Sequence, residues 1–258
     1  MKIGILGAMP EEIAFLGARM GIERQTRTAQ RDFLEGTWEG ASVVLAYSRI
    51  GKVSAALTTA LLLGTFRVTH VILTGVAGAL DRALRVGDVV IADRLMQHDL
   101  DASPLFPRYE IPLLGRSAFP CDLADSALNA ARAYIAEDFR RDVPPERAAD
   151  FGMSHPNVRR GLIVSGDQFL DDPAEGARIR GDLPEALCVE MEGAAVAQVC
   201  YEMGNIPCAV IRVISDDAGH SAAVDFTRFV RDVAEYLTGG IAARLVQNLR
   251  EETSRQDP

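Results

Sequence analysis

The chain has 258 residues, 48% of them hydrophobic, so it is long enough to bury a sizeable core. Its formal net charge of −9 disfavours nucleic acids and anionic membranes as partners, because both are bound by clustered Lys and Arg. The composition is that of a folded protein and excludes a disordered chain.

The N-terminus enters a short apolar segment at 3–6 without the charged and long apolar regions of a secretory signal. No apolar run approaches the ~20 residues that a transmembrane helix needs. We therefore expect a soluble, cytoplasmic protein. The four cysteines and four histidines are dispersed with no Cys-x-x-Cys pair, which predicts free thiols in a reducing compartment and no metal site. These residues are Cys121, Cys188, Cys200, Cys208, His70, His98, His155 and His220.

Short apolar, β-branched segments alternate with longer helical patterns, which is typical of a mixed sheet with helices on its faces. In the first half of the chain the predicted elements are a strand at 2–6, a helix from about residue 11, a hairpin of 32–38 and 42–47, a helix at 53–63, and strands at 70–73 and 88–92.

Four prolines predict irregular loop over 98–121. The predicted elements after it are a helix at 123–136, an arginine-rich connector at 139–147, strands at 162–165 and 187–189, a helix at 192–203 and a strand at 209–215.

Apolar residues spaced by three and four between Phe226 and Leu249 predict a long terminal helix with one face on the sheet, which Gly239 and Gly240 would bend. Residues 253–258 are expected to form a frayed tail. With no repeat and no linker, we predict one α/β domain over 1–252, a three-layer sandwich with helices flanking a central mixed, twisted sheet.

Four predicted loops follow strand ends, where ligands collect in open α/β sheets. The loop at 7–13 carries Glu11 and Glu12 at a helix start, although acidic residues there also complement the helix dipole without any further function. The loop at 74–78 has two glycines that would let a backbone approach a ligand. The loop at 165–170 presents Phe169, although a lone Phe is more often part of a core.

The fourth loop gives the strongest signal. Glu190 and Glu192 flank Met191 where an apolar strand joins an alanine-rich helix, and Asp216 ends another apolar strand. Charges in such places need a partner or a function. The alternative for Asp216 is a helix cap.

Together these segments resemble the methylthioadenosine/S-adenosylhomocysteine nucleosidases, within the nucleoside phosphorylase fold. The resemblance extends from Ile3 to Phe226 and is carried by a combination of five motifs. They are Gly7–Glu12, Ile50–Val53, Ser165–Phe169, Val189–Glu192 and Ser215–Asp216.

The resemblance implies hydrolysis of the N-ribosidic bond of an adenine thionucleoside, as in nucleoside catabolism and methionine salvage. Glu12 would polarise the attacking water with help from Arg212, and Asp216 would protonate N7 of adenine. The chemistry is coherent in itself, because cleavage builds positive charge on the sugar and negative charge on the purine, so one carboxyl must donate a proton while another activates water. A partly buried aspartate can stay protonated for this role. No cofactor, metal or phosphate is required.

The resemblance also implies a substrate-binding set. Ribose would be gripped by Glu192 and the Met191 backbone, adenine would stack on Phe169, and Ile50 would line the alkylthio pocket with Phe226. The whole predicted set is Met9, Ile50, Ala77, Phe169, Leu170, Glu190, Met191, Glu192, Ser215 and Phe226.

The chain departs from the usual family pattern at several places. Pro10 replaces an acidic residue, Val76 a small polar one and Arg49 a glycine, so that Arg49 could reach the sugar or the water. The loop at 101–113 is also unusual. In relatives this loop closes the neighbouring subunit's pocket, which, with its apolar side chains, predicts a homodimer and leaves the 5′ substituent open.

Three alternatives remain at this point. The first is a phosphate-dependent nucleoside phosphorylase, which the acidic first loop disfavours because a carboxylate at Glu12 would repel phosphate. The second is a futalosine-type nucleosidase. The third is a non-catalytic binding protein, which would not need both Glu12 and Asp216 at strand ends.

Overall fold

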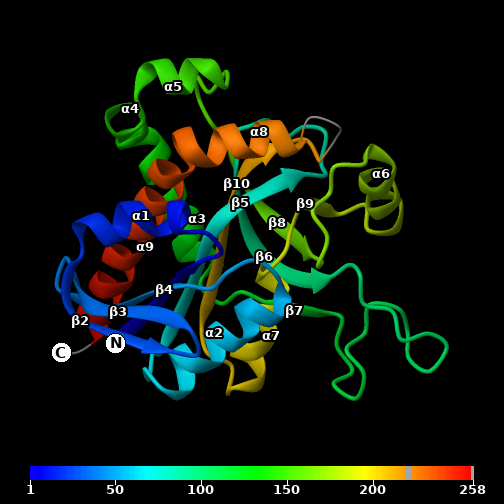
Figure 1. Cartoon of the computed structure of the whole chain (residues 1–258), viewed down its shortest axis with the longest axis horizontal. Coiled ribbons are helices and arrows are strands. Elements are labelled where there is room, and N and C mark those ends of the chain that lie inside the picture. Colours follow the sequence, from blue (N-terminus) through cyan, green and yellow to red (C-terminus); the bar gives the residue numbers. More distant parts are fainter. Residues whose placement is uncertain (219–221, 257–258) are drawn as a thin grey trace.

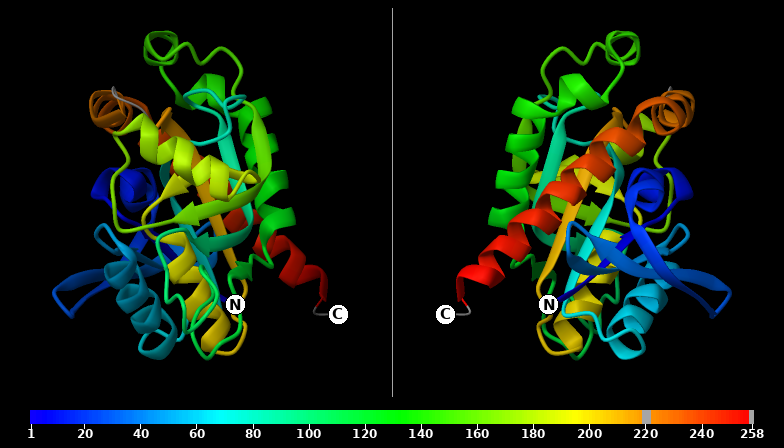
Figure 2. Two further views of the ribbon diagram at one scale, coloured as in Figure 1. Left: turned by 90° about the vertical axis from the view of Figure 1, so that its right-hand side faces the viewer. Right: turned by 90° about the vertical axis from the view of Figure 1, so that its left-hand side faces the viewer.

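A mixed sheet runs through the molecule, with helices on both of its faces (Figures 1 and 2). The computed structural model describes residues 1–218 and 222–256, and over these the sheet has ten strands. Its strands are β1 (Lys2–Gly7), β2 (Gly21–Thr28), β3 (Arg31–Trp38), β4 (Ala41–Tyr47), β5 (His70–Ala79), β6 (Val89–Gln97), β7 (Ala118–Pro120), β8 (Val158–Ser165), β9 (Ala186–Glu190) and β10 (Cys208–Asp216). The predicted single α/β domain is confirmed.

The helices form two layers. Helices α1, α3 and α9 pack together over one face, while α2 packs with α7 over the other. The helical elements are α1 (Pro10–Arg19), α2 (Lys52–Gly64), α3 (Ala124–Glu137), α4 (Phe139–Asp142), α5 (Pro145–Asp150), α6 (Pro173–Asp182), α7 (Gly193–Glu202), α8 (Ala222–Phe229), the π-helical turn η1 (Val230–Ala234) and α9 (Glu235–Gln256).

One half of the sheet closes on itself, which the sequence did not predict. Strand β5 pairs with β1, β10 and β9, and the order β5–β10–β6–β8–β9 returns to β5. The remaining strands extend as an open sheet in the order β5–β1–β4–β3–β2. Strand β5 therefore belongs to both parts, and the ligand cavity described below lies beside its C-terminal half.

Strand β5 is longer than predicted. The segment Thr74–Gly78, which we expected to be a loop, continues the strand and pairs with β10. Its glycines allow other side chains to approach the strand closely: a Cβ at Gly75 would overlap Arg212 and Glu12, and one at Gly78 would overlap Asp216. These glycines are thus explained by close packing against site residues and not by a turn.

The terminal helix forms as predicted on its apolar face, and the residues from Val230 to Leu249 at the predicted spacing are buried. Helix α9 passes through Gly239 and Gly240 without interruption. A Cβ at these positions would overlap Phe15 of α1 and Tyr134 of α3, so the glycines let three helices pack closely. Helix α9 continues to Gln256, beyond the predicted end at 252, and residues 257–258 lie outside the described residues.

Several elements were not predicted. Strand β2 is mostly exposed and polar, so it lacks the apolar alternation that signals a strand. Short helices α4 and α5 lie within the expected connector, and β7 lies within the expected loop, where it pairs with β6. Helix α6 was also missed, although Asp172 caps it and Pro173 opens it, which is a recognisable helix start.

Candidate active site

A cavity of about 230 Å³ lies beside the C-terminal ends of β1, β5, β9 and β10. Glu12, Asp216 and every residue predicted to bind substrate lie in its walls. Arg212, the remaining predicted residue, is fully buried and is not among the lining residues. The lining residues that were not predicted are Ala8, Val76, Gly78, Gln168, Val189 and Ala218. Most are small or apolar and carry no chemical signal of their own, but each lies within two residues of a predicted one.

Glu12 lies in the first turn of α1 and is buried. One carboxylate oxygen accepts hydrogen bonds from the amides of Ala8 (2.6 Å) and Met9 (2.9 Å), and the other from the amide of Val76 (3.1 Å). From its place in the polar first turn of a helix, Glu12 is predicted to lie near solvent, and this prediction is wrong because the side chain is buried. Its side chain fills a cradle of backbone N–H groups between the first loop and β5, the kind of site that binds anions.

Behind the cavity, the Arg212 guanidinium from β10 forms ion pairs with Glu190 and, at 3.1 Å, with Glu192. Glu12 also lies near enough to Arg212 to interact electrostatically. One buried cation thus faces three buried carboxylates. Desolvation is severe for all four groups, and the excess of negative charge favours a proton on one of the carboxyls.

The pKa values follow this charge balance. Burial raises the pKa of Glu12, although Arg212 and the three backbone amides oppose the shift. Burial also raises the pKa of Glu192 to about 7, with a further increase from Glu190 and Glu12, while Arg212 and the Gly51 amide act against it. Perturbed carboxyls that line one cavity are typical of sites that transfer protons.

The Glu190 carboxylate is already engaged by the protein. It accepts hydrogen bonds from the amides of Glu192 (3.0 Å) and Gly193 (2.8 Å) and from the Ser165 hydroxyl, besides its ion pair with Arg212. Glu190 thereby fixes the start of α7 against the ends of β8 and β10. It borders the cavity, but its carboxylate mainly orients its neighbours.

Asp216 ends β10, four residues after Arg212 on the same strand, and is buried. Its carboxylate accepts hydrogen bonds from the Ser215 hydroxyl (2.7 Å) and the Ala218 amide (2.9 Å). Gly75 adjoins Glu12 and Gly78 adjoins Asp216, so the two carboxyls contact β5 three residues apart, or roughly 10 Å along a strand.

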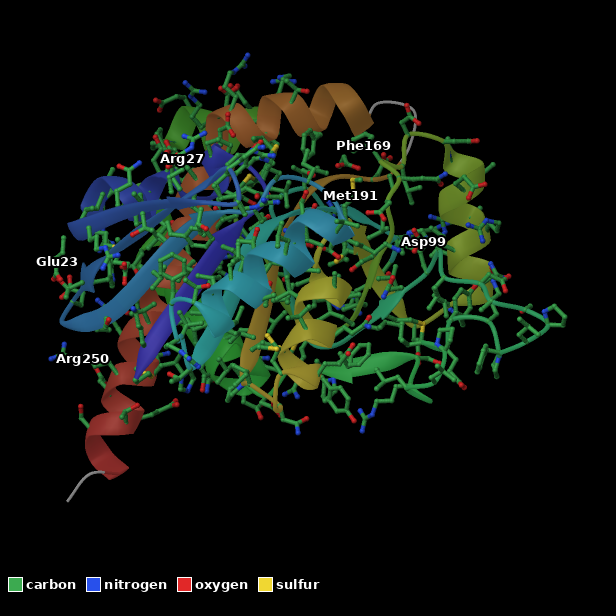
Figure 3. The ribbon with its side chains drawn as sticks, turned by 60° about the horizontal axis from the view of Figure 1, so that its bottom comes forward. Glu23, Arg27, Asp99, Phe169, Met191 and Arg250 are labelled. Carbon is green, nitrogen blue, oxygen red and sulfur yellow. The ribbon has the colours of Figure 1, made fainter. Side chains whose placement is uncertain are left out.

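Aromatic side chains line the outer part of the cavity. Phe169 is 43% exposed, and its ring meets that of Phe226 edge-on, with the centroids 5.3 Å apart. Figure 3 shows Phe169 and Met191 close together in the same part of the view. A planar apolar group could stack here while its polar edge reaches the buried carboxyls.

Arg49 is directed away from the cavity. Its guanidinium donates to the carbonyl of Gln30 at 2.9 Å, in the turn between β2 and β3. The residue has φ 73°, in the left-handed region where glycine is favoured. The possibility that Arg49 reaches the sugar or the water is therefore not realised in this structure.

The described residues contain neither a metal-binding cluster nor a helix suited to crossing a membrane. No three His, Cys, Asp or Glu side chains in these ranges are grouped so that they could hold a metal ion. None of the helices in these ranges combines the length and the apolar character needed to cross a membrane.

Comparison with known proteins agrees with this geometry. The model of the Phosphorylase superfamily matches residues 2–247. A 5′-methylthioadenosine/S-adenosylhomocysteine nucleosidase from Lysinibacillus sphaericus is 40% identical over 238 residues, which cover 92% of this chain and 96% of the relative. The same kind of enzyme from Bacillus licheniformis is 36% identical over 250 residues, covering 96% and 100%. The chain belongs to the methylthioadenosine/S-adenosylhomocysteine nucleosidase family.

Solved structures support the same relationship. The nucleosidase of this family from Neisseria meningitidis, in complex with methylthio-immucillin-A, has a TM-score of 0.84 and 34% identity, covering 95% of this chain and 98% of that one. The futalosine hydrolase of Helicobacter pylori also resembles the chain, with a TM-score of 0.78 and 32% identity, covering 98% of each. The fold is therefore shared by hydrolases that are named for different substrates.

Proposed function

We propose that this protein hydrolyses the N-ribosidic bond of 5′-methylthioadenosine and S-adenosylhomocysteine, releasing adenine and the thioribose product. The observation that carries the proposal is the pair of buried carboxyls, Glu12 and Asp216, in one cavity beside an exposed aromatic ring. The two carboxyls adjoin different glycines of β5, three residues apart, so a sugar and a water can lie between them, as in inverting glycoside hydrolysis.

In this mechanism Glu12 accepts the proton of the attacking water. Its raised pKa moves the carboxylate toward the range in which it is an effective base near neutral pH. The Arg212 guanidinium orients the adjoining carboxylates and balances part of their charge. Asp216, with Ser215 beside it, donates a proton to N7 of the departing adenine.

The remaining residues bind and orient the substrate. Glu192 and the Met191 backbone hold the ribose hydroxyls, with Met9 and Ala77 beside the sugar. Phe169 stacks on adenine and the Leu170 backbone reads its edge. Ile50 and Phe226 contact the 5′-alkylthio group, and Glu190 orients Glu192 through the amides that it accepts.

Water, and not phosphate, is the proposed nucleophile. The amides of Ala8, Met9 and Val76, which could otherwise bind a phosphate, already donate to Glu12. An anionic nucleophile would have to approach this buried carboxylate, and the repulsion would be strong in a site of low polarity.

We further propose that the protein is a cytoplasmic homodimer that takes part in methionine salvage. Val53 (80% exposed) and Leu57 lie one turn apart on the outer face of α2, and Leu105 and Leu113 are exposed on the loop at 101–113, which projects from the body of the molecule (Figure 1). Apolar side chains gathered in this way mark a surface that a partner covers.

The decisive test is incubation with methylthioadenosine in a buffer free of phosphate and containing a metal chelator. We expect release of free adenine, which chromatography would measure, and a comparable release from S-adenosylhomocysteine. Activity that requires added phosphate would make the protein a phosphorylase. Preference for futalosine would support the second kind of nucleosidase, and binding without turnover would support a non-catalytic role.

A further inference from the structure

The N-terminus of α2 is held by carboxylates from distant parts of the chain. Gly51, at the cap position, donates its amide to Glu192 at 2.9 Å, and Lys52 donates its amide to Asp167 at 2.8 Å. No side chain of the helix itself makes a capping bond. Two consecutive N–H groups, which a helix start leaves unpaired, therefore join the ribose-binding carboxylate to the loop at 166–170.

A second set of contacts, made by the side chains of Lys52 and Asp99, links the same helix start to the same loop. Asp99, just after β6, accepts a hydrogen bond from the Lys52 ammonium at 2.6 Å and another from the Asp167 amide at 2.9 Å. The Lys52 ammonium also donates to Gln97 at 2.9 Å. In Figure 3 the label of Asp99 lies to one side of Met191, toward α6. None of Lys52, Asp99 and Asp167 is among the lining residues of the cavity.

The loop at 166–170 carries Phe169 and is anchored at both ends. At its root, Gly166 donates its amide to the Glu190 carbonyl and lies so close to His98 that a Cβ at this position would overlap the imidazole. At its other end, Leu170 is buried in an apolar cluster. Between these anchors Phe169 is 43% exposed, and the only loop residue bonded to both Lys52 and Asp99 among the described residues is Asp167, so its bonds set the path of the chain into Phe169.

The Lys52 ammonium and the Asp167 amide favour the ionised form of the Asp99 carboxyl. Burial would raise the pKa of its carboxyl, but the hydrogen bonds and charge of Lys52, together with the Asp167 amide, outweigh burial and lower the pKa. The carboxylate thus remains ionised and bonded to both partners at neutral pH. Its side chain is partly exposed, so the ion pair contributes little to global stability.

We propose that Lys52, Asp99 and Asp167 form an interlock that sets the position of the adenine-stacking loop relative to the ribose carboxylate Glu192. The three are positioning residues, since they act through the Gly51–Lys52 backbone and the loop and not by contact with substrate. The inference rests on the proposed function for the identity of the substrate, but the interlock itself is a property of the free protein.

The test compares Asp99→Asn, Lys52→Met and the double variant with wild type. We expect KM for methylthioadenosine to rise about five- to tenfold in each single variant, as for loss of the net contribution of one typical hydrogen bond, with a smaller change in kcat. The double variant should be no worse than the more affected single one, because both changes break one unit. The inhibition constant of adenine as a product should rise by a similar factor, whereas that of the thioribose product, which has no base to stack on Phe169, should stay unchanged.

The matched controls are Glu35→Gln and Lys2→Met. Lys2 and Glu35 form an ion pair of 3.0 Å with similar exposure at the opposite end of β1 from the cavity, so these changes remove the same groups without touching the loop. They should leave KM unchanged. If KM in the Asp99 and Lys52 variants matched these controls, or if the inhibition constant of the thioribose product rose as much as that of adenine, the interlock would be refuted.

Amide hydrogen exchange keeps this inference separate from the proposed function. Asp99→Ala should speed exchange at Asp167 at least tenfold in the free protein, because the acceptor of that amide is removed. If wild type released no adenine while this exchange changed as expected, the proposed function alone would fail. Unchanged exchange in an active enzyme would overturn the interlock.

Discussion

Glu12 and Asp216 enter one cavity from opposite ends of the sequence and in different electrostatic surroundings. Glu12 accepts three backbone amides near the buried Arg212, whereas Asp216 lies at the end of β10, where the Ser215 hydroxyl and the Ala218 amide donate to it. These surroundings suit the two proposed tasks, since the first stabilises the carboxylate that we propose as the base. The division of roles can be separated by changing the leaving group.

We predict that Asp216→Asn reduces kcat/KM for methylthioadenosine about 10²–10⁴-fold, because the variant cannot protonate adenine. The loss should shrink greatly on a thioribosyl substrate with a nitrophenolate leaving group, which departs without a proton. Glu12→Gln should damage turnover of both substrates, because each needs an activated water. Steady-state kinetics of both variants on both substrates provides the measurement.

An equal loss for Asp216→Asn on the two substrates would contradict its role as the acid. Asp216 would then be a structural residue that holds the Ala218 amide after β10.

Glu192 gives a prediction for stability. Its pKa is raised to about 7 in the folded protein by burial, so the folded state holds a proton that the unfolded chain releases near its ordinary value of 4.5. The stability that this proton provides is therefore present below about pH 4.5 and is lost as pH rises toward 7. Glu192→Gln should remove this loss, which is at most on the order of 3 kcal/mol for such a shift.

Urea unfolding of wild type and Glu192→Gln from pH 5 to pH 8 measures the effect. The difference in unfolding free energy should move in favour of the variant as pH rises. Parallel curves for the two proteins across this range would show that Glu192 does not carry the proton.

At the scale of elements, β5 fixes the positions of the Glu12 and Asp216 carboxyls relative to each other. Gly75 and Gly78 leave space on the strand for Arg212, Glu12 and Asp216, so a side chain at either glycine would displace site residues. The site therefore depends on the absence of side chains at Gly75 and Gly78.

We predict that Gly75→Ala reduces kcat/KM about 10²-fold, because a displacement of about 1 Å in a catalytic group can cost this much. The added Cβ would overlap the Arg212 guanidinium and the Glu12 carboxylate. Gly181→Ala in α6 is the control, since its Cβ would have no atom within 4 Å, and it should leave kinetics unchanged. Unaltered kinetics in Gly75→Ala would mean that the site tolerates a shift of both groups.

Much of the fold could be predicted from local patterns, and the part that could not depends on long-range contacts. The apolar strand β1 and the terminal helix have strong periodic signals, and the hairpin turn carries Glu39 and Gly40, both with positive φ. The polar edge strand β2 has no such signal. Gly75 and Gly78 suggested a turn because their true reason, the approach of side chains from β10 and α1, cannot be read from neighbouring residues.

In the site, too, some features could be predicted from local sequence patterns, and others depend on long-range contacts. The residues expected from the motifs converge on one cavity, since strand ends bring them together. The solvation of Glu12 was misjudged because its burial depends on Val76 of β5. Lys52 lies in the Ile50–Val53 motif but was given no role, and Asp99 was not singled out, because a surface ion pair has no distinctive sequence pattern.

At the scale of the whole molecule, the exposed apolar residues of α2 and of the 101–113 loop determine the expected assembly. We predict a particle of twice the chain mass by light scattering, and a monomer after Val53→Glu combined with Leu57→Glu, because charges would then oppose burial of this face. Ile22→Glu, on the exposed strand β2, is the control and should leave the mass unchanged. A monomeric wild-type protein with full activity would disprove the dimer.

The closure of the sheet through β10 also dictates when the protein can fold during synthesis. Strands β5 and β6 are complete once residue 97 has emerged from the ribosome, yet β10, which pairs with both, ends only at Asp216. Until then the growing chain must keep two apolar strand edges unpaired, a state prone to association with other chains. The proposed base, Glu12, is made before this interval and the proposed acid, Asp216, at its end, so a nascent chain interrupted before β10 would expose its central strands and lack the proposed acid.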